Sequence, residues 1–236
     1  MTEDYFAGPV AERYDSTLDE WGDPAAIAAT ADFLAELAGD GTALELGIGT
    51  GRIALPLSAR GVRVHGIDLS VDMVAQLRAK PGGGDIPVAI GDFATTRVGE
   101  GFSLAYLVFN TIGNLTSQEA QVACFENAAA QLRPGGCFVV EVGVAVREPL
   151  HVFALSDTHI GIDEYDPATQ RLVSHHFTLV DGRWELRSIP FRSVSPAELD
   201  LMARLAGIRL RERWSGWRRE PFTAESRRHV SVWEKP

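Results

Sequence analysis

The segment LELGIGTGR, residues 44–52, is an apolar run that holds a glutamate and then breaks into three glycines and an arginine. This pattern is typical of a buried strand that turns sharply into a helix. Glycine adopts backbone conformations that are closed to other residues, so Gly47, Gly49 and Gly51 would let a ligand contact the main chain. Glu45 would place a carboxylate just behind this turn. The segment therefore predicts a ligand site at the end of a strand.

Strands and helices alternate around this turn. Helices are expected over residues 23–38, 52–61, 71–80 and 117–132. Strands are expected over residues 42–48, 62–70, 87–92, 102–110 and 137–144. Strands that are separated by helices pair in parallel through right-handed crossovers. The pattern predicts an α/β domain with a parallel sheet covered on both faces.

The pattern changes after residue 146. Residues 159–166, 170–180 and 183–195 are strand-like, are joined by turn residues at 180–183, and have no helix between them, which indicates an antiparallel insertion. A helix then follows with its own start and stop signals. It runs over residues 195–207, and two further strands close the chain at 208–214 and 228–234.

Side chains that can bind a ligand follow several predicted strands. Ligands of open parallel sheets lie beyond the carboxyl ends of the strands, so residues at these positions are candidates. Asp68 follows the second strand and can accept hydrogen bonds from both hydroxyls of a ribose. Asp92 can accept from the amine of an adenine, and Phe93 can cover a ring face. The glycines are spaced GxGxG rather than GxGxxG, which argues against a dinucleotide pyrophosphate.

Five segments together resemble the class I S-adenosylmethionine-dependent methyltransferases in their order and spacing. They are LELGIGTGR, HGIDLSVDMV, GDF, FNTIGNL and LRPGGCFVVEV. The resemblance covers roughly residues 25–146. It implies a seven-stranded, mostly parallel Rossmann-like sheet with a reversed C-terminal β-hairpin, an antiparallel β insertion after the fifth strand, and S-adenosyl-L-methionine as the cofactor.

The resemblance also assigns roles to residues. The glycine turn matches the loop that passes the methionyl part of the cofactor, Asp68 matches the ribose acid, and Asp92 and Phe93 match the adenine contacts. The remaining predicted cofactor contacts are Tyr14, Glu45, Leu69, Met73 and Phe109. Tyr5, Phe6 and Trp21 are aromatic residues that either cover the site or simply pack on the domain.

The resemblance predicts that the chain forms a single methyltransferase domain. Its parts are an N-terminal lid segment at 1–23, a cofactor-binding core at 24–146, an antiparallel insertion at 147–194 that builds a lid or substrate wall, and a final helix with two strands at 195–236.

Methyl transfer from a sulfonium requires mainly alignment and the exclusion of water. A general base is needed only if the acceptor starts protonated. The residues predicted to touch the acceptor or to assist catalysis are His176, Asn110 and Tyr14. His175 and His176 are adjacent, so in a strand only one of them can face a site. His151 and His159 are further candidates, and each of these histidines has a purely structural interpretation as well.

Composition limits the class of partner. The net charge of −10 argues against a surface that follows nucleic-acid phosphates. No apolar run is long enough to span a membrane, and no cluster of histidine, cysteine and acidic residues has the spacing of metal ligands. The two cysteines show no disulfide pattern. We expect a cytoplasmic protein, for which a homodimer is one candidate assembly.

The predicted function is methyl transfer to nitrogen or oxygen of a small molecule, with a secondary metabolite or an amino sugar as the expected acceptor. Three alternatives remain open on the sequence. One is a nicotinamide-dependent dehydrogenase that uses the same sheet, and another is a non-catalytic protein that keeps the pocket. The third is a methyltransferase that acts on a protein.

Overall fold

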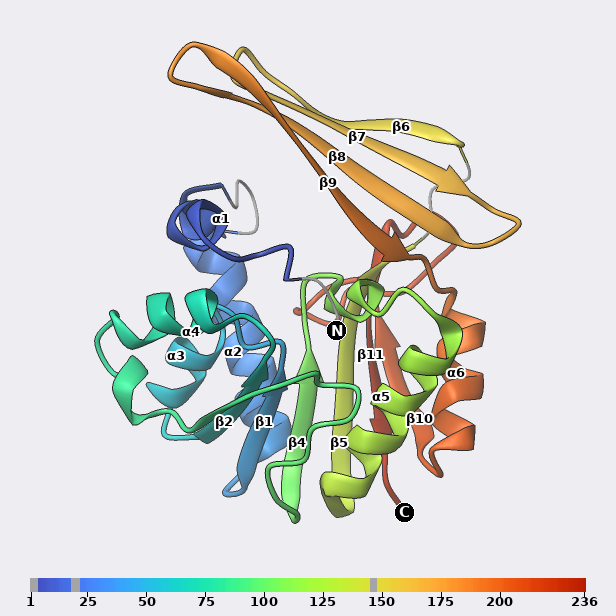
Figure 1. Cartoon of the computed structure of the whole chain (residues 1–236). Coiled ribbons are helices and arrows are strands. Elements are labelled where there is room, and N and C mark those ends of the chain that lie inside the picture. The colour runs from blue at the N-terminus through green and yellow to red at the C-terminus, as the bar shows by residue number, and fades with distance from the viewer. Residues whose placement is uncertain (1–3, 18–21, 145–147) are drawn as a thin grey trace.

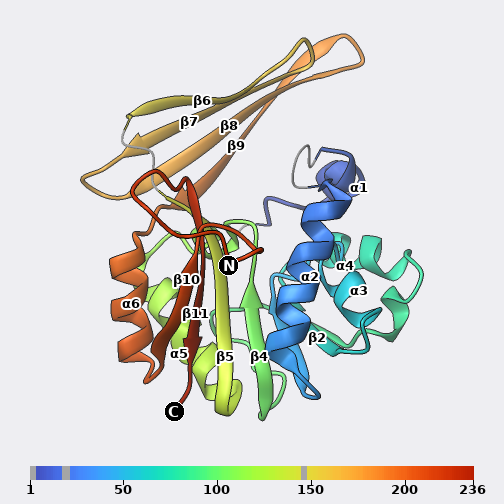
Figure 2. The same cartoon turned by 180° about the vertical axis from the view of Figure 1, so that it is seen from behind.

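The structure is a computed structural model, and it describes residues 4–17, 22–144 and 148–236. A seven-stranded sheet has helices on both faces, and a separate antiparallel sheet of four strands stands above the edge at which the parallel strands end (Figures 1 and 2). We call the four-stranded sheet, β6 to β9, the lid sheet. This arrangement is the predicted fold class.

The helices are short to medium in length. They are α1 (Pro9–Arg13), α2 (Pro24–Ala38), α3 (Ala54–Ser58), α4 (Val71–Arg78), α5 (Gln118–Gln131) and α6 (Pro196–Leu205), with 3-10 turns η1 (Tyr14–Thr17), η3 (Gly83–Asp85) and η4 (Thr111–Asn114). Asp23 and Ser195 cap α2 and α6, since each side chain accepts a backbone N–H of the first turn. In the described part of the chain no helix has the length and apolar character to cross a membrane.

The main sheet has the order β10-β11-β5-β4-β1-β2-β3. Its strands are β1 (Thr42–Leu46), β2 (Arg63–Asp68), β3 (Val88–Ile90), β4 (Phe102–Leu107), β5 (Leu132–Gly143), β10 (Arg209–Trp214) and β11 (Arg228–Glu234). All neighbours from β5 to β3 pair in parallel, whereas β11 is antiparallel to both β5 and β10. The predicted reversed hairpin is therefore confirmed.

Two apolar clusters hold the helices on the sheet. One cluster packs α5 and α6 against one face, and the other packs α2 and α3 against the opposite face. The two parallel strands at the centre are buried along nearly their whole length, because both of their faces are covered. Hydrophobic burial on both faces fixes the strands, so that their carboxyl ends meet along one edge.

The lid sheet contains one strand that the sequence did not predict. Its strands are β6 (Leu150–Leu155), β7 (His159–Asp166), β8 (Arg171–Val180) and β9 (Arg183–Arg192). β6 is an edge strand that pairs only with β7, and a bulge between Val152 and Ala154 interrupts its alternation. A bulge breaks the period of two that identifies a strand in sequence, which explains the omission.

Two predicted boundaries were also wrong. The helix expected over 52–61 spans only Ala54–Ser58. The fifth strand begins at Leu132 rather than 137, because Leu132 already pairs with Phe102 and the register then shifts before Leu104. The segment RPGG does end α5, as expected, but it lies inside the strand as an irregularity.

A buried polar network fixes the lid sheet to the core. Arg192, at the end of β9, is 7% exposed and donates to Gln121 Oε1 (2.5 Å) on α5, to Gln170 Oε1 (2.6 Å) and to Glu198 Oε1 (2.7 Å) on α6. Burial acts to raise the pKa of Glu198, but hydrogen bonds from Arg192, Gln170 and Gln118 hold it below its ordinary value. Glu198 therefore stays ionised and keeps the network charged.

Replacing Arg192 should loosen this attachment. We expect Arg192→Met to lower the free energy of unfolding by about 3 kcal/mol, because Glu198 then loses its buried counter-charge. Urea unfolding followed by circular dichroism measures the change. The control is Arg209→Met, whose side chain is 71% exposed and lies 3.8 Å from Glu234. It should change stability by less than about 0.5 kcal/mol. Equal effects of the two substitutions would contradict the role given to the network.

Candidate active site

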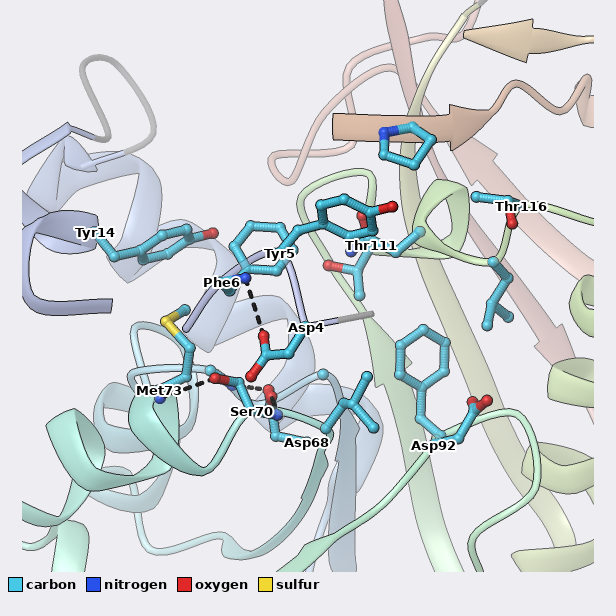
Figure 3. A pocket seen from close by; sticks show the side chains of 17 residues that line it. Asp4, Tyr5, Phe6, Tyr14, Asp68, Ser70, Met73, Asp92, Thr111 and Thr116 are labelled. Carbon is cyan, nitrogen blue, oxygen red and sulfur yellow. Dashed lines mark hydrogen bonds between the residues drawn. The ribbon is translucent and has the colours of Figure 1, made fainter. Parts of the chain in front are cut away.

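A cavity of about 500 Å³ lies at the carboxyl ends of the parallel strands. It is bounded below by the turn after β1 and the ends of β2 and β3, on the side by the segment after β4, and above by the N-terminal segment and β9 (Figure 3). The lining residues are Asp4, Tyr5, Phe6, Tyr14, Gly47, Gly49, Asp68, Leu69, Ser70, Met73, Asp92, Phe93, Thr111, Asn114, Leu115, Thr116 and Pro190. A cavity of this size suits one small ligand.

The glycine turn after β1 is required for two different reasons. Gly47 and Gly49 line the cavity and have φ values of +77° and +53°, a region in which other residues are strained. A Cβ atom on Gly47 would also lie 2.7 Å from Thr111 Cγ2. Gly51 has φ +78° but faces α4, where an added Cβ would lie 2.3 Å from Leu77 Cδ1. Gly51 thus serves helix packing, while the other two glycines expose backbone to the cavity.

Asp68 links the glycine turn to the end of β2. Its Oδ2 accepts from the Gly49 N–H at 2.6 Å, and its Oδ1 accepts from the Ser70 N–H at 2.8 Å. Burial raises the pKa of Asp68, and these two hydrogen bonds act in the opposite direction. Each carboxylate oxygen has a second lone pair, so Asp68 can also accept from hydroxyl groups of a ligand in the cavity.

The far end of the cavity suits a flat ring with a polar edge. Phe93 is 8% exposed and lines the cavity, as do Leu69, which follows β2, and Met73, which lies on α4. Asp92 precedes Phe93, and its Oδ1 accepts from the Ala94 N–H at 2.9 Å. Apolar walls with one acceptor at the edge match an adenine base with its exocyclic amine.

The N-terminal segment covers the cavity from above. Figure 3 shows Tyr5, Phe6 and Tyr14 on the side opposite Asp68. The segment is tied to the glycine turn, because Asp15 accepts from the Thr50 hydroxyl at 2.6 Å. The sequence grouped Trp21 with these aromatic residues, but Trp21 lies outside the described residues.

Tyr14 lines both this cavity and a smaller one beside it. Burial raises the pKa of Tyr14 to about 12; Asp68 and Asp15 add to this effect, while Arg52 and Arg187 oppose it. The phenol is therefore protonated at neutral pH, so it can donate a hydrogen bond but is not poised to remove a proton.

The smaller cavity, of about 40 Å³, extends under the glycine turn and is lined by Glu45, Arg52 and Phe109 among others. Glu45 is buried and accepts from the Tyr106 hydroxyl at 2.9 Å. Burial raises the pKa of Glu45 to about 8, although the Tyr106 hydrogen bond and the Arg52 charge lower it. The Arg52 guanidinium lies 5.1 Å from the centre of the Phe109 ring. Our sequence analysis gave Arg52 no role, although it directly follows the three glycines.

The segment after β4 has an unusual backbone. Phe109 and Asn110 both have φ of 59°, which is uncommon for residues other than glycine and clusters at functional sites. The Phe109 N–H donates to Glu141 Oε2 at 3.0 Å, and Asn110 Oδ1 accepts from the Gly143 N–H at 2.6 Å. The Asn110 side chain thus joins β4 to β5, and Asn110 is not among the described residues that line the cavity. Its contact with an acceptor stays a prediction.

His176 lies in the lid sheet, where it pairs with Gly161 on β7 and Arg187 on β9. Burial, followed by the charge of Arg187, lowers the pKa of His176 to about 4. The imidazole is neutral at physiological pH and is a weak base. His176 does not line the cavity in the part of the chain that the structure covers, so its catalytic role also stays a prediction.

Several lining residues were not identified from the sequence. Asn114 is the last residue of η4, and Leu115 and Thr116 follow it. The first two of these residues close the segment FNTIGNL, but the sequence assigned them no role. Pro190 comes from the lid sheet, and no local sequence signal connects it with the glycine turn. Within the described ranges, no group of three or more histidine, cysteine or acidic residues could hold a metal ion.

Comparison with known proteins identifies relatives of the chain. Residues 43–136 match the family model described as a methyltransferase domain. The structure of the CcbJ methyltransferase from Streptomyces caelestis is 36% identical, with 99% of both chains covered and a TM-score of 0.88. The cypemycin N-terminal methyltransferase from Streptomyces sp. is 27% identical over 82% of this chain and 83% of the relative. The fold also resembles that of CalS10, an amino pentose methyltransferase from Micromonospora echinaspora, at 20% identity, 94% and 96% coverage and a TM-score of 0.70.

The raised pKa of Glu45 predicts a pH dependence of stability. The folded chain holds the proton of Glu45 up to about pH 8, whereas the unfolded chain releases it near its ordinary value of 4.5. The stabilisation by protonated Glu45 is complete below pH 4.5 and is lost as the pH rises towards 8. We expect Glu45→Gln, which does not titrate, to gain stability relative to the wild type between pH 5 and pH 8. Urea unfolding at both pH values measures this.

The control for that experiment is Glu100→Gln, at an exposed position. It should reproduce the pH dependence of the wild type. If Glu45→Gln also follows the wild type in parallel at all pH values, Glu45 is not held protonated in the folded chain.

Proposed function

The chain belongs to the class I S-adenosylmethionine-dependent methyltransferases, and from this we propose that it methylates an amine nitrogen of a small secondary metabolite. The family assignment removes the dehydrogenase and the non-catalytic alternatives. The observation that carries the proposal is the cavity of about 500 Å³, which is covered by the N-terminal segment and the lid sheet. A covered cavity admits a small acceptor or a chain end but not a folded surface.

The residues around the cavity fit S-adenosyl-L-methionine. The backbone of Gly47 and Gly49 would contact the methionyl part, and Asp68 would accept from the ribose hydroxyls. Phe93 and Asp92 would hold the adenine. When bound, the cofactor supplies a methyl group on a positively charged sulfur. A nucleoside matches this site better than a phosphate ligand does. The site offers backbone without side chains, one acceptor at the sugar position and apolar walls.

The smaller cavity supplies complementary charges for an amino acid. The Arg52 guanidinium would pair with the methionyl carboxylate, and the Glu45 carboxyl would face the ammonium. Binding of an ammonium beside Glu45 favours its ionised form, which offsets the cost of burying a carboxylate. Arg52 is a residue that our sequence analysis did not assign.

The chain itself contributes alignment and exclusion of water. The acceptor nitrogen must lie in line with the methyl carbon and the sulfur, and the N-terminal segment and the lid sheet hold the acceptor in that orientation. Tyr14, which is protonated, would donate a hydrogen bond to the acceptor or to the cofactor. In this proposal residues 24–146 bind the cofactor, and residues 147–194 form the wall of the acceptor site.

The electrostatics favour nitrogen over oxygen as the methylated atom. A hydroxyl acceptor must lose its proton to a base, whereas a neutral amine already has a reactive lone pair. His176, with a pKa of about 4, and Tyr14, with a pKa of about 12, are both poorly matched to proton removal near neutral pH. After transfer the new ammonium can lose its proton to water. The names of the cypemycin N-terminal and CalS10 amino pentose relatives agree with an amine.

A peptide amine is the second candidate acceptor. The cypemycin relative is named for methylation at an N-terminus, and the terminal residue of an unfolded peptide could enter the covered cavity. Methyl-labelled S-adenosylmethionine with a panel of amino sugars, amino acids and short peptides tests the proposal. Label in an amine supports it. Transfer only to hydroxyl compounds would contradict it.

Asp68→Ala should weaken the binding of S-adenosylhomocysteine, measured by calorimetry. Two hydrogen bonds to a charged acceptor are lost, which corresponds to about 3 kcal/mol or about 100-fold in affinity. Asp85→Ala, at an exposed position of η3, is the matched control and should bind as the wild type does. Melting temperatures of both variants report whether the glycine turn remains folded. Unchanged affinity of a folded Asp68→Ala would remove the ribose assignment.

We further propose that the protein works in the cytoplasm as a homodimer. Both cysteines are free thiols, as is usual in a reducing compartment. The dimer would form through the outer face of the lid sheet, where Leu155, Ile160, Phe177 and Leu186 make an apolar row across all four strands. Leu155 is 78% exposed and Leu186 59%. These four side chains carry no charge, so two copies with a net charge of −10 each could meet there without opposing carboxylates.

Leu186→Glu should shift the protein from dimer to monomer in light scattering coupled to gel filtration, because two carboxylates would then meet at the interface. Leu205→Glu, on the outside of α6 and 69% exposed, is the control and should leave the assembly unchanged. A wild-type monomer at all accessible concentrations would rule this interface out.

A further inference from the structure

The inner face of the lid sheet, which faces the core, carries an arginine that the cofactor site does not explain. Arg187 on β9 pairs with His176 on β8 and shares its face with Ile189, which is 2% exposed. Leu186, one residue earlier, lies on the opposite, exposed face. The alternation of side chains therefore directs Arg187 towards the core and not towards solvent.

Arg187 lies close to the proposed acceptor site. Its charge acts on the phenol of Tyr14, and the phenol acts on it in return. Tyr14 lines the main cavity and the smaller one beside it. Arg187 itself is not among the described residues that line either cavity, but it lies on β9 three residues before Pro190, which lines the main one.

The guanidinium is incompletely paired. Its Nη1 atom is buried and has no hydrogen-bond partner among the residues that the structure describes. Burial lowers the pKa of Arg187, which reflects the cost of removing a cation from water. A buried donor without a partner costs free energy, and such groups in a folded protein call for an explanation.

Aromatic rings lie beside Arg187 on this face of the sheet. His176 and His159 stack at 5.4 Å between ring centres with 5° between their planes, and His176 Nδ1 lies 3.2 Å from His159 Nε2. The edge of Phe153 packs against both rings. Because the pKa of His176 is about 4, the imidazole that pairs across the strands with Arg187 is uncharged at neutral pH. These rings form a rigid wall beside the cation without supplying a counter-ion.

We propose that Arg187 is a specificity-determining residue which binds an oxyanion of the methyl acceptor, either a carboxylate or a phosphate. Its planar guanidinium can hold such a group through two parallel hydrogen bonds, and this would satisfy the buried donor. The acceptor is then an amine that carries an anionic group at a distance from the reacting nitrogen. This inference rests on the proposed function.

The same cation assists the reaction of an amine. A positive charge near the acceptor disfavours the ammonium form and so raises the fraction of neutral amine. In the transfer the nitrogen lone pair forms the new bond to carbon, the carbon–sulfur bond breaks, and its electron pair stays on sulfur. Arg187 would bind the remote anion and increase the fraction of neutral amine in the acceptor, without accepting a proton itself.

The test uses the whole chain saturated with S-adenosylhomocysteine. Calorimetry at pH 7.5 and constant ionic strength, with chloride as the balancing anion, measures binding of sodium acetate and of inorganic phosphate. We expect saturable binding of one or both, and the preferred anion identifies the oxyanion. Arg187→Gln should weaken this binding about tenfold or more, which corresponds to one charge-assisted hydrogen bond.

Two further variants control the experiment. Arg183→Gln lies on the same strand at an exposed position and should bind the anion as the wild type does. Arg187→Lys keeps the charge without the planar pair of donors and should give an intermediate affinity. Absence of anion binding by the wild type, or equal binding by Arg187→Gln and the wild type, would overturn the proposal.

The readouts separate this inference from the proposed function. Binding of S-adenosylhomocysteine should be equal in the wild type, Arg187→Gln and Arg183→Gln, which also shows that the variants fold. If the wild type neither binds this nucleoside nor transfers the methyl label to an amine, the proposed function fails, whatever the anion does. If it binds the nucleoside but Arg187→Gln leaves anion affinity unchanged, only the role of Arg187 fails.

Discussion

The hydrogen bond from the Gly49 N–H to Asp68 joins the turn after β1 to the end of β2. The rest of the site depends on this contact, because it fixes a backbone without side chains beside a carboxylate. Gly49 can take part because it lies at positive φ, and Gly47, also at positive φ, leaves its space to Thr111. A side chain at Gly47 would collide with Thr111 and fill the floor of the cavity. The requirement for glycine here is thus both conformational and steric.

The second constraint is the attachment of the lid sheet. The buried Arg192 joins β9 to α5 and α6 through three side-chain partners, so the base of the sheet cannot move freely relative to the core. From this fixed base β9 extends above the edge at which the parallel strands end (Figure 1). Pro190, near the base, lines the cavity, and Arg187 lies three residues earlier on the strand. A rigid wall of this kind suits a reaction that depends on alignment, because small displacements of the acceptor have a large cost.

Burial controls the protonation of the groups around the site. It raises the pKa of Glu45 and Tyr14 and lowers that of His176, so that each of them favours its neutral form. Arg52 and Arg187 are then the cations that face this region, one beneath the glycine turn and one in the lid sheet. We propose that they bind the two negatively charged groups of the reactants, the carboxylate of the cofactor and the oxyanion of the acceptor.

The sequence by itself determined the cofactor half of the protein. The α/β class, the parallel pairing of the core strands and the lining positions of Gly47, Asp68 and Phe93 follow from patterns within single strand-turn-helix units. Such units are local, because their hydrophobic period and their turn residues lie at consecutive positions of the sequence. Where irregularities broke the period, β6 was not predicted and the start of β5 was placed five residues too late.

Only the tertiary structure decided the acceptor half. Pro190 lines the cavity from a sheet more than 100 residues away from the glycine turn, and Arg187 lies three residues earlier on the same strand. No local signal marks which face of that sheet is turned inward. The structure also separated Gly51, which packs on α4, from the two glycines that line the cavity. These distinctions depend on contacts between distant segments and on the burial that they create, and burial is a property of the folded chain alone.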